Sequence, residues 1–255
     1  MKPRRDFIKN VGKSLVAAPL IARTSGFAEE KKIRIGIIGA ENSHTRAFGR
    51  LFNKDKKFPG VEVRYVWGET DEFARDAAER GFIPHIVKDP LEMMGKIDAL
   101  IVDHRHPKYH LPAALPFIKE GIPTFIDKPF CYRVAEGKEF LQIARERGTP
   151  VTSYSSIAHR SATFDMQNQV SQIEDIEHVL MHGPADIYSE YGGIFFYGVH
   201  TVQPMLYMFG EKVDRVRVTI VDKDKVCANV VYNSGPLFTL FFTRGREWGT
   251  ILLTK

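Results

Sequence analysis

The feature that most constrains the fold is a regular alternation, between residues 32 and 154, of short apolar runs and longer amphipathic stretches. The apolar runs have the length of strands and lie at 32–39, 61–67, 85–87, 98–104, 124–127 and 151–154. The stretches at 44–52, 71–81, 109–121 and 134–148 have helical spacing. Strands that alternate with helices through short connections form a parallel sheet with helices on both faces. The sequence therefore predicts an α/β domain built on such a sheet.

Past residue 155 this alternation stops. Apolar runs at 177–183, 213–222, 225–233, 236–245 and 251–255 have the length of strands, and the longer apolar stretch 192–210 has that of a helix. This pattern predicts a smaller α+β domain in which one helix lies on a mainly antiparallel open sheet. We place the first domain at 29–154 and the second at 155–255.

The first 28 residues have the features of a twin-arginine export signal. The pair Arg4 and Arg5 is followed by Phe7, Ile8 and Lys9. The apolar stretch 15–22 is too short to cross a bilayer, which needs about 20 apolar residues. The small residues Gly26 and Ala28, on either side of Phe27, then provide a cleavage site. We expect the segment 1–28 to be removed and the protein to act in the periplasm, without attachment to the membrane after export.

The net charge of +5 is explained by this segment, which holds six basic residues and one acidic residue. The remainder has 30 basic and 30 acidic residues, so its composition does not indicate a nucleic-acid partner. It contains two cysteines, Cys131 and Cys227, far apart in the sequence, and we expect both to be free thiols.

Ligands of an α/β sheet bind outside the carboxyl ends of its strands, so the turn after the first strand is a candidate site. Gly39 occupies the place of the first glycine of a dinucleotide fingerprint, whereas Glu41 and His44 replace the second and third. A carboxylate at position 41 would repel a pyrophosphate unless it turns away or is protonated. Ser43, which follows Asn42, is positioned to cap the helix and leave its N-terminus for an anion.

Two further strand ends carry polar residues. Glu69, just past the second strand, stands where an acidic residue bonds a ribose hydroxyl. Asp127, Lys128 and Pro129 follow the fifth strand, and the proline fixes a lysine that points into the expected crevice. Partial burial lowers the pKa of such a lysine, which suits acid–base work on a hydroxyl or carbonyl.

The end of the fourth strand is rich in titratable groups: Asp103, His104, His106 and the nearby His110. These residue types suit zinc or iron, and the alternative is a polar pocket rim with His110 packed on its helix. His200, in the apolar stretch 192–210, is either a hydrogen-bonded core residue or a catalytic one.

Taken together, the turn at Gly39, the tripeptide 127–129 and the segment containing Gly192, Gly193, Gly198 and His200 resemble the glucose–fructose oxidoreductase and inositol dehydrogenase family (Gfo/Idh/MocA). The resemblance implies a Rossmann domain that binds NAD or NADP. It also implies an α+β domain whose open sheet serves substrate binding and formation of a homo-oligomer.

The resemblance assigns candidate site residues to this chain and no metal. Catalysis is assigned to Lys128 and His200. The cofactor is expected to contact Gly39, Glu41, Asn42, Ser43, Glu69, His106, Asp127 and Lys128. A carbohydrate-like substrate is expected to contact Lys128, Tyr154, Arg160, Tyr197 and His200.

The chain departs from the family pattern at the helix. Phe196 stands where the family has its catalytic aspartate, and Gln203 replaces a second aspartate, so we expect His200 to lack an orienting partner. Three hypotheses follow. The first is a sugar, cyclitol or related polyol oxidoreductase that uses NAD(P). The second is non-redox lyase or hydrolase chemistry, with Asp103 and the histidines near it as metal ligands or acid–base groups. The third is carbohydrate binding without catalysis.

Overall fold

The computed structural model describes residues 32–222, 225–243, 245 and 247–255. The predicted export signal and the first three residues of the predicted first domain lie outside these ranges. In the described part of the chain, the longest helices are too short or too polar to cross a membrane.

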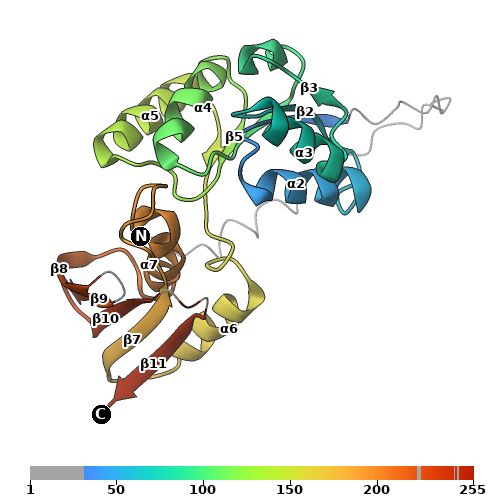
Figure 1. The fold of residues 1–255 in the computed structure, drawn as a ribbon. Helices are drawn as coiled ribbons and strands as arrows, with labels where there is room; N and C mark the ends of the chain where they lie inside the picture. The colour runs from blue at the N-terminus through green and yellow to red at the C-terminus, as the bar shows by residue number, and fades with distance from the viewer. Residues whose placement is uncertain (1–31, 223–224, 244, 246) are drawn as a thin grey trace, which may run out of the picture. The chain divides into compact units, whose positions relative to one another are not determined.

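The first sheet contains six parallel strands in the order β3-β2-β1-β4-β5-β6, as expected for an α/β fold (Figure 1). Its strands are β1 (Ile33–Ile38), β2 (Val61–Trp67), β3 (His85–Ile86), β4 (Ala99–Val102), β5 (Thr124–Ile126) and β6 (Val151–Thr152). The strand order reverses between β1 and β4, so the carboxyl ends of these two strands border the crevice in which ligands of such sheets bind.

Helices cover both faces of this sheet. They are α2 (Ser43–Gly49), which continues into the π-helical η1 (Arg50–Lys54), α3 (Asp71–Gly81), α4 (His110–Lys119) and α5 (Val134–Arg147), with 3-10 turns η2 (Pro90–Met93) and η3 (Pro107–Tyr109). Figure 1 shows α4 and α5 side by side. Ile38 of β1 belongs to the core beneath α4 and α5, whereas its neighbour Ile37 belongs to the core on the other face. Alternate strand residues point to opposite faces, so a continuous apolar run fits a strand buried on both sides.

The second sheet has the order β11-β7-β10-β9-β8 and is mainly antiparallel. Its strands are β7 (Ile176–Pro184), β8 (Val213–Asp222), β9 (Lys225–Tyr232), β10 (Leu237–Thr243) and β11 (Gly249–Thr254). The prediction of a mainly antiparallel sheet is confirmed, and the one parallel pair in it is β10 with β7. The helix α6 (Ser161–Val170) was not predicted, since its sequence is polar and only Thr163 and Val170 are buried.

The long apolar helix is α7 (Phe195–Phe209), and it lies on one face of the second sheet. Met205 of α7 packs in one core with Val179, Val230 and Phe238 of three different strands. The opposite face of the sheet exposes large apolar side chains, among them Phe241 and Ile251.

Gly39 brings the first turn close to the end of β4. Its φ of +106° is unfavourable for other residues, and a Cβ there would lie 2.6 Å from the backbone nitrogen of His104. The glycine therefore allows the β1–α2 turn to lie directly against the polar residues that follow β4.

Candidate active site

Five polar residues meet at the carboxyl ends of β1, β4 and β5. We call Asn42, His44, Asp103, Asp127 and Lys128 the polar cluster. Asp103 directly follows β4, and Asp127 directly follows β5. Asn42 is the N-cap of α2, and His44 lies in the first turn of that helix. Because neighbouring parallel strands end at the same edge of the sheet, the two aspartates are brought together.

One oxygen of Asp127 lies beside Asn42, His44 and Lys128. His44 Nδ1 lies 3.2 Å from Asp127 Oδ2, Asn42 Nδ2 donates to the same oxygen at 3.2 Å, and Lys128 Nζ lies 3.5 Å away. Burial raises the pKa of Asp127, but the hydrogen bond from His44 and the charge of Lys128 outweigh burial and lower it from its ordinary value. The Asp127 carboxyl is therefore ionised, and His44 donates from Nδ1.

Asp103 is fully buried, and its environment favours the protonated form. Burial, followed by the charge of Asp127, raises the pKa of Asp103 well above its ordinary value. Thr45 Oγ1 lies 2.6 Å from Asp103 Oδ2 and 2.7 Å from the carbonyl oxygen of Gly39. The single hydroxyl proton of Thr45 cannot serve both acceptors. A protonated Asp103 that donates to Thr45, while Thr45 donates to Gly39, satisfies all three groups.

The expectation that Ser43 caps α2 was wrong, because Asn42 does so. The Asn42 side-chain oxygen accepts from the backbone N–H of His44 at 3.3 Å, while its amide nitrogen donates to Asp103 at 2.9 Å. Ser43 is exposed as the first residue of the helix. One asparagine thus fixes the helix start and orients both carboxyl groups.

His44, Asp103 and Asp127 lie close enough together to hold a metal ion. The space between them is already used by protein donors, however. Lys128 supplies a positive charge next to Asp127, and the Asn42 amide donates to both carboxyls. A protonated Asp103 is also a poor cation ligand. The cluster is therefore better described as a hydrogen-bonded acid–base network.

The first turn is held by Glu69. Its Oε2 accepts from the backbone N–H groups of Ala40 and Glu41 at 2.8 and 2.9 Å. Its Oε1 is buried and has no hydrogen-bond partner within the described residues. An orphaned carboxylate oxygen at the end of β2 fits a donor such as a ribose hydroxyl, and the contact of Glu69 with a cofactor stays a prediction.

Glu41 does not point freely into the crevice. Its carboxylate accepts from the hydroxyl of Tyr191 at 2.6 Å and pairs with Arg105 at 3.2 Å. The Arg105 guanidinium also lies 3.9 Å from the centre of the Tyr191 ring. The hydrogen bond to Glu41 raises the pKa of Tyr191 to about 12. Arg105 thus compensates the negative charge that Glu41 brings to the phosphate-binding turn. Glu69 fits the ribose of a nucleotide, and the paired Glu41 does not exclude the diphosphate.

The histidines that follow β4 do not meet at one point with Asp103. Both ring nitrogens of the buried His110 face backbone carbonyls, those of Pro129 at 3.0 Å and His104 at 2.8 Å. His106 accepts from the backbone N–H of Lys108 and begins η3. Burial, and then the charge of His110, lowers the pKa of His104 to about 4. His110 therefore ties the Lys128–Pro129 segment to the end of β4 and has no nitrogen left for a metal.

His200 has an orienting partner, contrary to expectation. The hydroxyl of Ser155 lies 2.6 Å from His200 Nδ1, and the side chain of Gln203 accepts from the backbone N–H of Ser155 at 2.6 Å. Burial, followed by the charge of Lys128, lowers the pKa of His200 to about 4. Ser155 lies just past β6, a position that the motif comparison along the helix did not include.

Lys128 connects the cluster to α7. Only 8% of its side chain is exposed. Its Nζ lies 5.3 Å from the ring centre of Phe196 and 5.8 Å from that of Tyr197. The ring of Phe196 thus occupies the place of the expected aspartate and contacts the lysine through its π face.

Cavities adjoin the cluster on several sides. One of about 360 Å³ is lined by His44, Lys128 and Tyr154. Another of about 660 Å³ is lined by Ser43 and Tyr197. Arg160, predicted to contact substrate, lines only a small cavity of about 40 Å³ beside His200. The predicted substrate residues are therefore spread over three cavities around Lys128 and His200.

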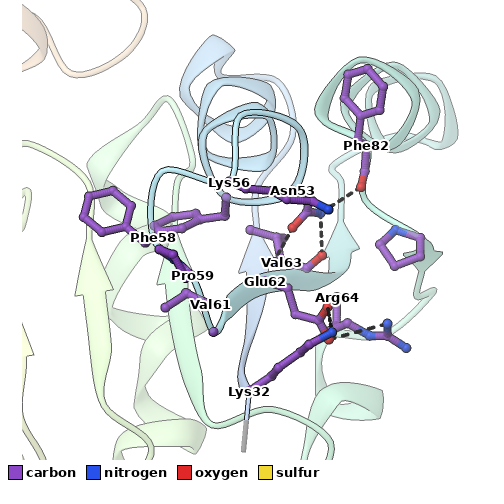
Figure 2. A pocket seen from close by; sticks show the side chains of 13 residues that line it. Lys32, Asn53, Lys56, Phe58, Pro59, Val61, Glu62, Val63, Arg64 and Phe82 are labelled. Atoms are coloured by element: carbon purple, nitrogen blue, oxygen red, sulfur yellow. Dashed lines mark hydrogen bonds and ion pairs between the residues drawn. The ribbon is translucent and has the colours of Figure 1, made fainter. Parts of the chain in front are cut away.

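A separate hollow of about 510 Å³ lies where β2 begins, at the opposite end of that strand from Glu69 (Figure 2). Lys32, Phe58 and Arg64 are among its lining residues, and Asn53 bonds the backbone of Val63 and Phe82 within it. It is not part of the candidate active site.

The fold and the cluster define a Rossmann-type protein with an acid–base site at the strand ends. Residues 33–155 match the family model of the GFO_IDH_MocA oxidoreductase family, NAD-binding Rossmann fold. The first domain is therefore similar to the NAD-binding domain of that family. In sequence, the chain matches no curated protein.

Solved structures share the fold over most of the chain. The myo-inositol dehydrogenase of Lactobacillus casei, in complex with NAD(H) and myo-inositol, is 16% identical with a TM-score of 0.75, over 88% of this chain and 72% of that one. The scyllo-inositol dehydrogenase of the same organism, with NAD(H) and scyllo-inositol, is 15% identical with a TM-score of 0.75, over 88% and 74%. GenD2 from gentamicin A biosynthesis, in complex with NAD, is 14% identical with a TM-score of 0.73, over 92% and 71%.

The protonated state of Asp103 predicts the behaviour of Asp103→Asn. Its folded pKa is raised, so the folded state binds the extra proton more tightly, and wild-type stability falls as pH rises above the ordinary pKa near 4. An amide is neutral at every pH. We expect the variant to gain in free energy of unfolding relative to wild type between pH 4 and pH 8, measured by urea denaturation. A difference that does not change with pH would contradict the assignment.

Proposed function

We propose that the protein is an NAD(P)-dependent oxidoreductase of a sugar, cyclitol or related polyol, exported to the periplasm. The observation that carries this proposal is the buried Lys128 at the end of β5. It contacts the ionised Asp127 on one side and the aromatic residues of α7 on the other. The match of the first domain to an oxidoreductase family model supports the redox chemistry.

Two of the described residues, Glu69 and Arg105, would contact different parts of a bound nucleotide. Glu69 would bond the adenosine ribose through its unpaired Oε1, and Arg105 lies beside the turn where a diphosphate would be held. When bound, the nicotinamide supplies or removes the hydride. The substrates of the L. casei dehydrogenases are ring polyols, and a related substrate is proposed for this chain.

The residues around the substrate would handle the proton and the orientation of the reacting hydroxyl. Lys128 is a hydrogen-bond donor to the hydroxyl or carbonyl oxygen, and Asp127 fixes its position. His200, held by Ser155 and neutral at pH 7, can bond a second substrate hydroxyl. The aromatic side chains beside Lys128 limit the access of water.

Lys128→Ala tests the role of the lysine. We expect kcat for polyol oxidation to fall about 10²–10⁴-fold, the usual effect of losing an acid–base group. The far-ultraviolet circular dichroism spectrum should stay unchanged. Lys138→Ala, on the exposed surface of α5, is the matched control and should leave kcat unchanged. Undiminished activity in Lys128→Ala would contradict the assignment.

A second candidate function, non-redox chemistry or carbohydrate binding, is favoured by one observation. Two backbone donors of the turn, those of Ala40 and Glu41, already donate to Glu69 and are therefore not free for a diphosphate. In this case the acid–base cluster would act without a nucleotide.

Nucleotide binding separates the two candidates. Denaturation of the protein purified from the periplasm should release NAD or NADP, identified by mass spectrometry. Removing the charge in Glu41→Gln should tighten NAD(P) binding about tenfold, or about 1.4 kcal/mol, measured by calorimetry. Glu139→Gln, an exposed residue of α5, is the control. If no nucleotide is released, and neither Glu41→Gln nor Glu139→Gln binds one, the redox proposal fails.

We also propose that the open face of the second sheet forms a homo-oligomer. Leu237, Phe241, Ile251 and Leu253 lie on this face and are 36%, 43%, 56% and 46% exposed. Several large apolar side chains exposed on one face of a sheet are characteristic of protein interfaces.

Phe241→Glu would place a charge in this interface. We expect the wild-type protein to sediment as an oligomer and the variant as a monomer, because burying an unpaired carboxylate is costly. Glu177→Gln, an exposed change on β7, is the control. A monomeric wild-type protein would contradict the proposal.

A further inference from the structure

In the sequence His44 stands at the place of a fingerprint glycine. In the structure it has the geometry of an acid–base group. Its Nδ1 lies 3.2 Å from Asp127 Oδ2, and 41% of its side chain is exposed. Because the ionised Asp127 accepts the Nδ1 proton, the lone pair of a neutral His44 is on Nε2. An ionised carboxylate that holds a histidine in this tautomer also stabilises the imidazolium form.

The exposed side of His44 borders the cavity of about 360 Å³. Its walls include the rings of Phe48, Phe125 and Tyr154, and its polar lining includes Lys128 and Ser156. Flat aromatic surfaces beside a few polar groups suit a ring that carries several hydroxyls. His44 and Lys128 therefore border the same cavity and share the same carboxylate oxygen.

The other histidines near Lys128 are less suited to exchange a proton with a substrate. His200 is 7% exposed, and burial and the charge of Lys128 lower its pKa to about 4. His110 is fully buried, with both nitrogens on carbonyls. His104 is buried beneath Trp67 and Tyr109. His44 combines exposure to a cavity with a buried anionic partner.

We propose that His44, held by Asp127, is the general base for a substrate hydroxyl, and that Asn42 and the protonated Asp103 position this pair. The substrate O–H bond breaks as the Nε2–H bond forms, and the positive charge that develops on the ring faces Asp127. In the reverse direction the same proton returns to the oxygen. The inference rests on the proposed oxidoreductase function, in which the hydride leaves the carbon for a nicotinamide.

Chemical rescue tests the role of His44. In His44→Gly we expect kcat for polyol oxidation to fall about a hundredfold or more, with a smaller change in KM. Added imidazole should restore part of the rate, because it can occupy the vacated space beside Asp127. His85→Gly, an exposed change on β3, should lose little activity and show no rescue. His44→Gln, which avoids a helical glycine, is the second variant if His44→Gly is unstable.

A measurement without substrate keeps this inference separate from the proposed function. Long-range nitrogen–proton correlation spectra report which nitrogen of each histidine is protonated. His44 should carry its proton on Nδ1 in the wild-type protein and lose this preference in Asp127→Asn. If the wild-type protein shows no turnover but His44 carries its proton on Nδ1, the oxidoreductase function fails while the pairing of His44 with Asp127 is supported. A proton on Nε2, or turnover in His44→Gly without loss or rescue, would overturn the inference.

Discussion

The buried negative charge of Asp127 is the interaction on which the rest of the site depends. A carboxylate taken out of water is costly unless it is paired and hydrogen-bonded. Here one oxygen faces the His44 ring, the Asn42 amide and the Lys128 ammonium. This arrangement also explains why the neighbouring Asp103 is protonated, because two adjacent buried carboxylates cannot both be ionised at low cost.

The same charge connects separate parts of the fold. It joins the start of α2 to the end of β5, and Asn42 extends the connection to Asp103 at the end of β4. A second ion pair, between Glu41 and Arg105, joins the first turn to the segment after β4, and Glu41 also accepts a hydrogen bond from Tyr191 in the segment before α7. Residues that weaken the match to a dinucleotide fingerprint, Glu41 and His44, are therefore the ones that build these contacts.

The sequence predicted most of the α/β domain because its apolar runs and amphipathic stretches differ clearly in length and period. It predicted less of the second domain, where α6 has few buried apolar residues and the parallel pairing of β10 with β7 leaves no local pattern. Asp127 and Lys128 were found from their place at a strand end. The proposed role of His44 was not predicted, because position 44 is a glycine in a dinucleotide fingerprint, although its place opposite Asp127 at one sheet edge was a usable signal. Ser155 was missed because its contact with His200 spans 45 residues.

The central claim is that Asp127 is ionised and holds His44 and Lys128 while Asp103 carries a proton. Neutron diffraction from a deuterium-exchanged crystal at pH 7 measures these protons directly. The account predicts deuterium on Asp103 Oδ2 and on His44 Nδ1, with none on Asp127. Deuterium on Asp127, with a bare Asp103 carboxylate, would contradict it.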